Sequence, residues 1–526
     1  MDIIGVEDIF IYAIIGINAD EQINKQEILI SFEIYTDTSK TLLNDSITEC
    51  YNYATIKKFI VKYVSGTKFL TLEALANNLV ANILSTYHVP EIKLTIKKVT
   101  ALSNTKYPYV TVKRRYHQNY TDGIFLAIGS NLGDRYKNIQ LCLELLKNNN
   151  INITETSNMY KSDPMYVLDQ PYFYNCVVQI NTNLNPFELL HIIKSIEKQI
   201  GSHDSSKGPR LIDIDILIYN NKVIDTTDLT IPHIGMLERN FVLQPFLDIC
   251  DIYHPITNIL LSCYMNKLHK CQKIIPLKNN KFINASVPFC MKVLNVTTDS
   301  FSGDGILETK LSIDNYSNCD IVDIGGESTR PKHISISTDD EIFRINQVFD
   351  IIKSQSKIIS IDTRKADVAK YFIDSDCDII NDVSGLSYDK NMINILLTNN
   401  VPFIICNNIQ SDDLTEYYDH LKKIEKMGVY KWNIIADVGL GINKKADQSI
   451  NIIQNLDKMS QKYVNILAFS RKKHIQTLMQ KNIETNIDIV DLGGYIIIQK
   501  AIDNHIYGFR LHNDDLFHVF KKINLF

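Results

Sequence analysis

The sequence lacks paired cysteines. Its ten cysteines lie singly along 526 residues, with no CxxC pair and no Cys/His cluster at the spacing of zinc ligands. These absences argue against a disulfide framework and against a structural zinc site. The cysteines are expected to be small buried side chains in a reducing compartment.

Long apolar runs and an excess of one charge are also missing. No apolar run approaches the roughly 18 residues of a membrane helix, and the N-terminal segment MDIIGVEDIF has acidic residues where a signal peptide has basic ones. The 55 Lys and Arg against 60 Asp and Glu leave a formal net charge of -5, which argues against a nucleic-acid surface or a polybasic anchor. We expect a cytoplasmic protein that binds small molecules, and neither nucleic acid nor membrane. Organellar targeting by a peptide that is removed stays open.

The length and composition are those of several globular domains. Hydrophobic residues make up 45% and charged residues 22% of the chain, so that each domain can bury a core. At roughly 100–200 residues per domain, the length predicts three or so domains. Short polar segments at 117–123 and 275–286 suggest the boundaries. We place the domains at 1–117, 122–273 and 285–526.

The three parts differ in their expected elements. The first reads as strand, strand, helix, helix, strand, strand, which indicates an antiparallel sheet with two helices. The second is typical of an α+β fold. The third repeats an apolar strand, a loop and a helix, which predicts a (β/α)₈ barrel and makes the fold class multidomain α+β and α/β. The eight barrel strands are expected at 291–296, 320–325, 357–362, 378–383, 401–406, 433–438, 465–470 and 506–511.

Polar residues stand at the C-terminal ends of most of these barrel strands. They are Asn295, Asp323, Glu327, Asp362, Asn381, Asp437, Ser470 with Lys472, and Arg510 with His512. In a parallel barrel these ends meet at one mouth, where catalytic groups sit. Any one of them is explained as well by a turn or a helix cap. The whole set favours a binding site.

At this point the third part resembles dihydropteroate synthase. The motifs that carry the resemblance are LNVTTDSFSGDG (294–305), DIGGESTRP (323–331), SIDT (360–363), INDVSG (380–385), SRK (470–472) and RLH (510–512). The resemblance implies that p-aminobenzoate replaces pyrophosphate on the methylene group of a pterin. Related barrels transfer a methyl group from a reduced pterin instead, and that chemistry is the alternative.

The same resemblance assigns roles to residues of this barrel. The pterin ring would be bound by Asp362, Asn381, Asp437 and Lys472. The pyrophosphate and its Mg²⁺ would be bound by Asn295, Arg510 and His512, so that Lys472, Arg510 and His512 are the expected catalytic groups. Loops with Asp299, Phe301, Thr329, Arg330 and Pro331 would close over p-aminobenzoate. Lys473 stands where the family has a small hydroxyl residue, and its ammonium group could pair with the carboxylate of p-aminobenzoate.

Two aspartates of the second part alternate along an expected strand. In LIDIDILIY, Asp213 and Asp215 point to one side, a geometry that suits Mg²⁺ bridging to nucleotide phosphates. A solvated edge strand shows the same pattern as often. The surrounding motifs FLAIGSNLGDR, DQPYFYN, GPRLIDIDIL and IPHIGMLERNFVL resemble 6-hydroxymethyl-7,8-dihydropterin pyrophosphokinase over about residues 123–270.

This second resemblance implies a ferredoxin-like α+β domain and assigns roles to residues of its site. Asp213 and Asp215 would bind two Mg²⁺ ions, Arg210, His233 and Arg239 would contact ATP phosphates, and Phe173, Asn175 and Phe241 would enclose the pterin. Asp213, Asp215 and Arg210 are the expected catalytic groups. The loop 201–210 lacks the arginines and the tryptophan that are usual in the family, although His203 and Lys207 substitute in part, and slower turnover is expected.

The first part has weaker signals. Alone, Lys98 reads as a surface lysine and Glu73 as a solvated helix residue. Gly16 with Glu21, Asn52 with Tyr53, LEALA around Glu73, and Lys98 together resemble dihydroneopterin aldolase. The resemblance implies that Glu73 anchors the pterin, that Lys98 and Tyr53 act as general acid and base with Glu21 in the same catalytic group, and that glycolaldehyde leaves without zinc or a Schiff base.

Two departures from the aldolase pattern keep alternatives open. Ile15 stands where the family commonly has His, and Val99 stands where it has Pro. The first domain is therefore an aldolase, an epimerase, or an inactive pterin-binding scaffold for assembly. Such domains share their sites between subunits, which implies a homo-oligomer.

The three resemblances follow the order of consecutive steps in folate synthesis. We predict a trifunctional enzyme that cleaves dihydroneopterin, pyrophosphorylates the product with ATP as co-substrate and Mg²⁺ as cofactor, and condenses it with p-aminobenzoate to dihydropteroate.

Overall fold

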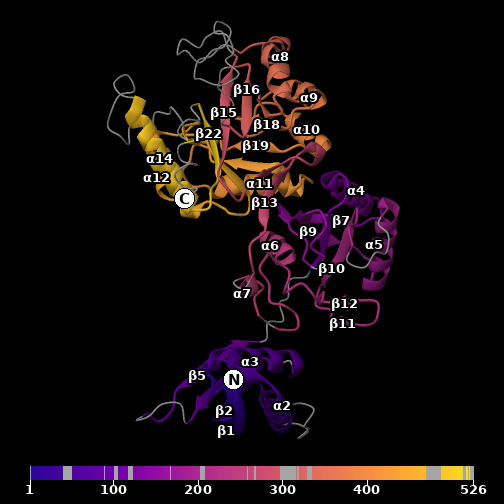
Figure 1. Ribbon diagram of the computed structural model, residues 1–526, viewed down its shortest axis with the longest axis vertical. Coiled ribbons are helices and arrows are strands. Elements are labelled where there is room, and N and C mark those ends of the chain that lie inside the picture. Colours follow the sequence, from indigo (N-terminus) through magenta and orange to yellow (C-terminus); the bar gives the residue numbers. More distant parts are fainter. Residues whose placement is uncertain are drawn as a thin grey trace. The chain divides into compact units, whose positions relative to one another are not determined.

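Two open sheets, a two-stranded ribbon and a closed barrel organise the computed structural model (Figure 1). The structure describes residues 2–39, 50–87, 89–99, 105–115, 123–165, 167–201, 208–257, 259–265, 268–296, 316, 319–327, 335–469, 487–512, 517–518 and 521. By Cα proximity the chain forms two units. One comprises Met1–Ile124, Ile216–Glu238 and Cys250–Leu268, and the other comprises Phe125–Asp215, Arg239–Ile249 and His269–Phe526.

Alternating apolar residues build the first sheet. Its strands lie in the order β3-β1-β2-β4-β5, antiparallel except for the short parallel pair of β1 and β3. They are β1 (Asp2–Ile15), β2 (Gln26–Thr36), β3 (Lys68–Phe69), β4 (Glu91–Lys98) and β5 (Tyr109–Arg115). Every second residue of β2 and β4 is buried against α2 (Tyr53–Ser65) and α3 (Leu72–Tyr87). This is the predicted element order, with β3 added.

The second sheet has seven strands in the order β10-β6-β9-β8-β13-β14, with β7 paired to β9. They are β6 (Ile124–Ser130), β7 (Asn152–Thr156), β8 (Met159–Ser162), β9 (Phe173–Asn181), β10 (Asp213–Tyr219), β13 (Gln272–Pro276) and β14 (Phe282–Asn284). Its helices are α4 (Arg135–Asn148), α5 (Pro186–Ile200), α6 (Asn240–Ile249) and the short α7 (Ser262–Met265). The ribbon pairs β11 (Ile224–Asp225) with β12 (Thr230–Ile231). The mixture confirms the expected α+β class.

Eight parallel strands close the barrel, because β15 pairs with both β16 and β22. They are β15 (Phe289–Asn295), β16 (Ile321–Gly325), β17 (Ile358–Asp362), β18 (Ile379–Asp382), β19 (Phe403–Cys406), β20 (Ile434–Asp437), β21 (Val464–Leu467) and β22 (Gly508–Leu511). All eight predicted strands are confirmed. The helices are α8 (Thr338–Ser354), α9 (Ala366–Asp374), α10 (Met392–Asn399), α11 (Thr415–Lys426), α12 (Ala446–Gln454) and α14 (Ile487–Asp503), with the 3₁₀ turns η2 (Lys278–Asn280), η4 (Lys431–Asn433) and η5 (Leu456–Lys458).

The segment 275–286 is not the polar linker that its composition suggested. β13 and β14 pair through it as a hairpin, and β13 also pairs with β8. Ile275 and Ile283 from this hairpin are buried in one cluster with Ile321 and Ile379 at the starts of barrel strands. The hairpin therefore packs its apolar side chains at the N-terminal end of the barrel, opposite the mouth.

Most described cysteines are buried, as expected. Cys263 is exposed, and Cys50 and Cys250 are half-buried, so the prediction fails for these three. Cys263 lies in the short helix α7, which has no buried residue, and Cys250 directly follows α6.

The turn after β20 requires glycine at position 439. Gly439 has φ +68°, and an added Cβ would lie 2.1 Å from the carbonyl oxygen of Asn407. We expect Gly439→Ala to lower the free energy of unfolding by about 1–3 kcal/mol. The measurement is denaturant unfolding followed by the fluorescence of Trp432, the one tryptophan, which is buried in the barrel domain.

Gly428→Ala is the matched control. Gly428 also has positive φ, +108°, but an added Cβ would meet only a leucine methyl group, at 3.8 Å. A loss for Gly439→Ala no larger than that for Gly428→Ala would contradict the steric explanation.

Candidate functional sites

The barrel brings its predicted polar residues into one row. The strand register places Asn295 beside Gly325, Gly325 beside Asp362, and Asp362 beside Asn381. Because the strands are parallel and in register, these side chains meet at the C-terminal mouth. Asp437 ends β20, where its Oδ1 accepts a hydrogen bond from Gly439 N at 2.9 Å.

A buried guanidinium group joins two carboxylates at this mouth. Arg510 Nε donates to Asp323 Oδ2 at 2.7 Å, and its Nη2 donates to Asp362 Oδ2 at 2.6 Å. Asn381 Nδ2 also donates to Asp323 Oδ2, at 2.9 Å. Burial raises the pKa of Asp362 to about 7, and the charge of Arg510 offsets part of that rise. The nearby carboxylates raise the pKa of Arg510, which stays a cation.

Asp323 is the residue of this site whose role the sequence reasoning missed. It is fully buried, and within the described chain its Oδ1 atom has no hydrogen-bond partner. A buried carboxylate oxygen of this kind is costly unless a ligand satisfies it. Its position in the DIGGESTRP motif was a signal that could have found it.

Several predicted barrel residues lie outside the described residues. They are Asp299, Phe301, Thr329, Arg330, Pro331, Lys472 and Lys473. Their neighbour Glu327 is described, and its carboxylate pairs with Arg364 at 2.6 Å and Lys365 at 2.7 Å. His512 directly follows β22 and is half-buried.

In the second domain the two aspartates of β10 each face an arginine. Arg210 Nη1 donates to Asp213 Oδ1 at 2.7 Å, and Arg239 Nη1 lies 3.7 Å from Asp215 Oδ2. Both carboxylates are on the same face of the strand, as predicted. Burial, and then the negative charge of Asp215, raise the pKa of Asp213 to about 6. Two carboxylates on one face of a strand are oxygen ligands of the kind that Mg²⁺ prefers.

The remaining predicted residues of this domain lie on three other segments. Asn175 is buried in β9 and donates from Nδ2 to Ser162 Oγ at 2.9 Å. Phe173 begins the same strand, and Phe241 lies in the first turn of α6. His233 follows β12, and its Nδ1 accepts from Gly235 N at 3.1 Å. His203 and Lys207 are outside the described residues.

Asn131 is a buried residue that the sequence reasoning left without a role. Its Oδ1 accepts from Arg210 N at 2.7 Å, while its Nδ2 donates to Gln170 Oε1 and to the Pro171 carbonyl, both at 3.2 Å. It ties together three of the four motifs that carry the resemblance. Because amide side chains in loops are common, its position in FLAIGSNLGDR alone did not reveal this.

In the first domain Lys98 and Glu21 form a close pair. Lys98 Nζ lies 2.5 Å from Glu21 Oε1 and donates to the Ile15 carbonyl at 3.0 Å. The hydrogen bond from Lys98 lowers the pKa of Glu21. Only 7% of Lys98 is exposed, so the surface-lysine alternative is wrong. Gly16 has φ +150°, and an added Cβ would overlap Glu21.

Tyr53 and Glu73 stand apart from that pair. Tyr53 is the first residue of α2, after its N-cap Asn52, and is 55% exposed. Glu73 lies exposed in the first turn of α3. Within the described part of the chain, no hydrogen bond or ion pair joins either residue to Lys98 or Glu21.

Two features are absent from the described part of the chain. None of the helices there is both long and apolar enough to span a bilayer. Among the same residues, no group of three or more His, Cys, Asp or Glu side chains is arranged to hold a metal ion.

Three protein families match successive parts of the chain. Residues 4–114 match dihydroneopterin aldolase, residues 125–251 match 7,8-dihydro-6-hydroxymethylpterin-pyrophosphokinase (HPPK), and residues 291–512 match the pterin binding enzymes. Each match contains the sites described above for its domain.

Solved structures share the fold of the last two domains. HPPK-DHPS of Plasmodium falciparum with pteroate has a TM-score of 0.58 and 22% sequence identity, covering 78% of this chain and 99% of that one. A second HPPK-DHPS in complex with substrates has a TM-score of 0.59 and 19% identity, covering 77% and 100%. At this level of identity the likeness concerns the fold.

Curated relatives extend the likeness to the whole chain. Folic acid synthesis protein fol1 of Pneumocystis carinii is 34% identical over 504 residues, covering 87% of this chain and 68% of the relative. Folic acid synthesis protein FOL1 of Dictyostelium discoideum is 32% identical over 574 residues, covering 86% of each. The chain therefore belongs to the family of folic acid synthesis proteins, with dihydroneopterin aldolase, pyrophosphokinase and dihydropteroate synthase activities in consecutive domains.

Proposed function

We propose that this chain carries dihydroneopterin to dihydropteroate with its own three sites, in domains at 1–117, 122–273 and 285–526. The observation that carries the proposal is the row of Asn295, Asp362 and Asn381 at the barrel mouth, where Arg510 pairs with Asp362. It supports the synthase rather than the methyltransferase alternative, because Arg510 brings a guanidinium group to this mouth, and guanidinium groups bind the oxygens of an anionic leaving group such as pyrophosphate.

In the synthase, the pterin edge is bound by Asp362, Asn381 and Asp437, with Lys472 from beyond the described residues. Carboxylate and amide groups fit its alternating donors and acceptors. Arg510 Nη1 and His512 contact the departing pyrophosphate, where positive charge stabilises the negative charge that develops. We add Asp323 as the residue that orients Arg510. The loops with Asp299, Phe301, Thr329, Arg330 and Pro331 exclude water around p-aminobenzoate, and the ammonium group of Lys473 pairs with its carboxylate.

In the kinase, ATP is the co-substrate, and Asp213 and Asp215 fit Mg²⁺. Two carboxylates on one face, with the remaining positions left to water and phosphate oxygens, are the usual protein share of a magnesium site. When bound, Mg²⁺ neutralises phosphate charge. Arg210, His233 and Arg239 orient the phosphates, while Phe173, Asn175 and Phe241 hold the pterin so that its hydroxyl faces ATP. In the barrel, Asn295 would be a ligand of the Mg²⁺ ion that accompanies the pyrophosphate.

In the aldolase, the pair of Lys98 and Glu21 is suited to move a proton. Glu21 holds the ammonium group of Lys98 in place, and Tyr53 is the second acid-base group. Glu73 anchors the pterin. Because Tyr53 and Glu73 are exposed at the starts of their helices, we infer that a neighbouring subunit completes the site and that the chain is a homo-oligomer. Epimerisation by the same groups is the second candidate.

The direct test is a reaction of the full-length chain with dihydroneopterin, ATP, Mg²⁺ and p-aminobenzoate. We expect dihydropteroate, glycolaldehyde, AMP and pyrophosphate. Persistence of dihydroneopterin, or its conversion to an epimer only, would contradict the aldolase assignment. Accumulation of hydroxymethyldihydropterin would contradict an active kinase.

Synthase activity should depend on pH through Asp362. Its carboxylate must be ionised to accept hydrogen bonds from the pterin, and burial raises its pKa to about 7. We therefore expect kcat/KM for the pterin pyrophosphate to fall as the pH is lowered through about 7. Asp362→Asn is the control. Its kcat/KM should be lower and should lack the fall near pH 7, whereas an unchanged fall near pH 7 would assign the titration to another group.

Aldolase activity should depend on Lys98 and not on its neighbour. We expect Lys98→Met to lower aldolase kcat by about 10²–10⁴-fold, since it removes an acid-base group. The matched control is Lys97→Met, which removes a lysine that pairs with Asp8 at the surface. Kinase and synthase rates of the same preparations show whether the rest of the chain is intact. Equal aldolase losses in both variants would refute the role of Lys98.

A further inference from the structure

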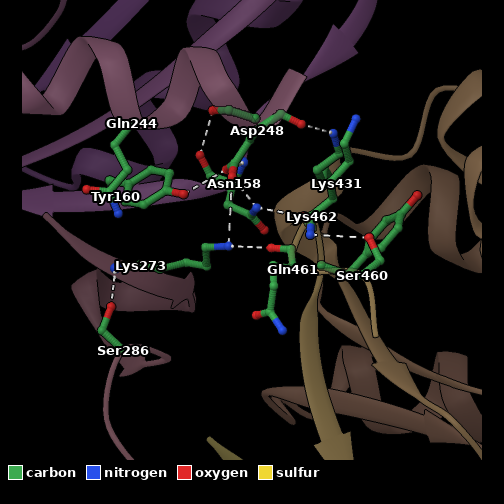
Figure 2. A network of polar contacts seen from close by, with 12 residues as sticks. Asn158, Tyr160, Gln244, Asp248, Lys273, Ser286, Lys431, Ser460, Gln461 and Lys462 are labelled. Carbon is green, nitrogen blue, oxygen red and sulfur yellow. Dashed lines mark hydrogen bonds and ion pairs between the residues drawn. The ribbon is translucent and has the colours of Figure 1, made fainter. Parts of the chain in front are cut away.

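Helix α6 of the kinase domain ends against residues of the synthase domain (Figure 2). The carbonyl groups of a last helical turn have no partner within the helix and form the negative end of its dipole. The last turn of α6 contains no basic residue. Instead, Lys431 Nζ donates to the Asp248 carbonyl at 3.3 Å, and Lys462 Nζ donates to the Ile249 carbonyl at 3.4 Å. The synthase domain thus supplies the C-terminal cap of a kinase helix.

The side chain of Asp248 fixes the same end of α6 within the kinase domain. Its Oδ2 atom accepts from Asn158 N at 2.9 Å, Asn158 Nδ2 at 2.7 Å and Tyr160 OH at 2.8 Å. Asn158 is fully buried, and its Nδ2 also donates to the Lys462 carbonyl at 2.8 Å. The helix end, the start of β8 and the synthase residue Lys462 are therefore held in one polar network, which Figure 2 shows.

Lys431 is itself held from both sides. Only 3% of it is exposed. Its Nζ lies 3.5 Å from Glu425 Oε2 on α11, and its backbone N donates to Thr156 Oγ1 at 2.9 Å. A buried ammonium group with a carboxylate partner is held in one place. Lys431 can therefore act as a fixed cap rather than as a mobile surface lysine.

The other end of α6 carries two residues assigned to the kinase site. The Arg239 carbonyl accepts from Val242 N at 3.1 Å and Leu243 N at 3.0 Å, so that Arg239 directly precedes the helix and is hydrogen-bonded to its first turn. Its guanidinium group faces Asp215, and Phe241 lies in the first turn. Ten residues of helix span about 15 Å. Pro245 lies within the helix, but Val242, Leu243 and Phe246 are buried along it, so that a shift at its capped end is passed through this packing to the residues at its other end.

We propose that Lys431 and Lys462 of the synthase domain are positioning residues of the kinase reaction. By holding the C-terminal end of α6 they keep Arg239 and Phe241 in register with the carboxylates of β10. This inference rests on the proposed roles of Arg239 and Phe241 in binding ATP and the pterin. It implies that this kinase domain relies on its synthase domain for the geometry of its own site.

The test compares the two activities of the full-length chain. Lys462→Met removes an exposed capping lysine. Lys431→Met is combined with Glu425→Gln, so that no buried carboxylate is left without its partner. Because two capping charges are lost when these substitutions are combined, the expected effect is a rise of about three- to tenfold in the kinase KM for ATP and for the pterin. Synthase kcat and KM should stay unchanged.

Two further variants separate charge from packing. Lys462→Arg keeps the positive charge, so that its kinase KM should be that of the unchanged chain and not that of Lys462→Met. Lys458→Met removes an exposed lysine of η5 and should change neither activity. The proposal is overturned if kinase and synthase activities decline together, or if Lys462→Arg has the raised KM of Lys462→Met. Either result would mean that the lysines only stabilise the fold.

Arg239→Ala distinguishes failure of this inference from failure of the proposed function. If Arg239→Ala raises the kinase KM and the combined lysine variant does not, the positioning role is wrong while the site assignment stands. If Arg239→Ala has no effect, the assignment of Arg239 itself is wrong, and the positioning role falls with it.

Discussion

A carboxylate matched by a fixed cation is found at each candidate site of this chain. A buried carboxylate is costly unless a cation or several donors satisfy it. Glu21 has Lys98, Asp213 has Arg210, and Asp362 shares Arg510 with Asp323. Each pair holds its members in place before substrate arrives, and each leaves a strongly polar group where a pterin, a phosphate or a metal ion is to bind.

Buried polar contacts also hold together the kinase and synthase parts of the second unit. Asp248 is satisfied by Asn158 and Tyr160, while Lys431 and Lys462 cap the helix that carries it. The hairpin of β13 and β14 adds an apolar contact, since it is paired to the kinase sheet and packed at the N-terminal end of the barrel. Kinase and synthase domains thus share both a sheet-derived hairpin and a polar network. This sharing is why a kinase residue can depend on a synthase residue.

What could be predicted from the sequence follows from local periodicity. Eight apolar strands with polar ends place Asn295, Asp362 and Asn381 in one row, because parallel strands in register bring their ends together. Alternation along β10 likewise places Asp213 and Asp215 on one face. These residues belong to motifs of a few residues each, and those motifs were enough to name the families.

Contacts between distant segments could not be predicted in this way. The burial of Lys98 depends on the Ile15 carbonyl, 83 residues earlier, and the pairing of Arg510 with Asp323 spans 187 residues. The segment 275–286 looked polar because its lysines and asparagines mask two short strands whose apolar residues find partners in the barrel. Asn131 is an ordinary loop amide until the fold places three motifs around it.

Burial raises the pKa of Asp213 and of Asp362, so that each carboxyl group can lose a proton when a ligand binds, and the number of protons released on binding measures this effect. Calorimetry of the full-length chain with Mg²⁺ and a non-hydrolysable ATP analogue, in buffers of different ionisation enthalpy, measures that release. With the pKa of Asp213 at about 6, we predict that at pH 6 the chain releases about half a proton more than Asp213→Asn does, and that the difference disappears at pH 8. Equal proton release by the two proteins at pH 6 would contradict a raised pKa of Asp213.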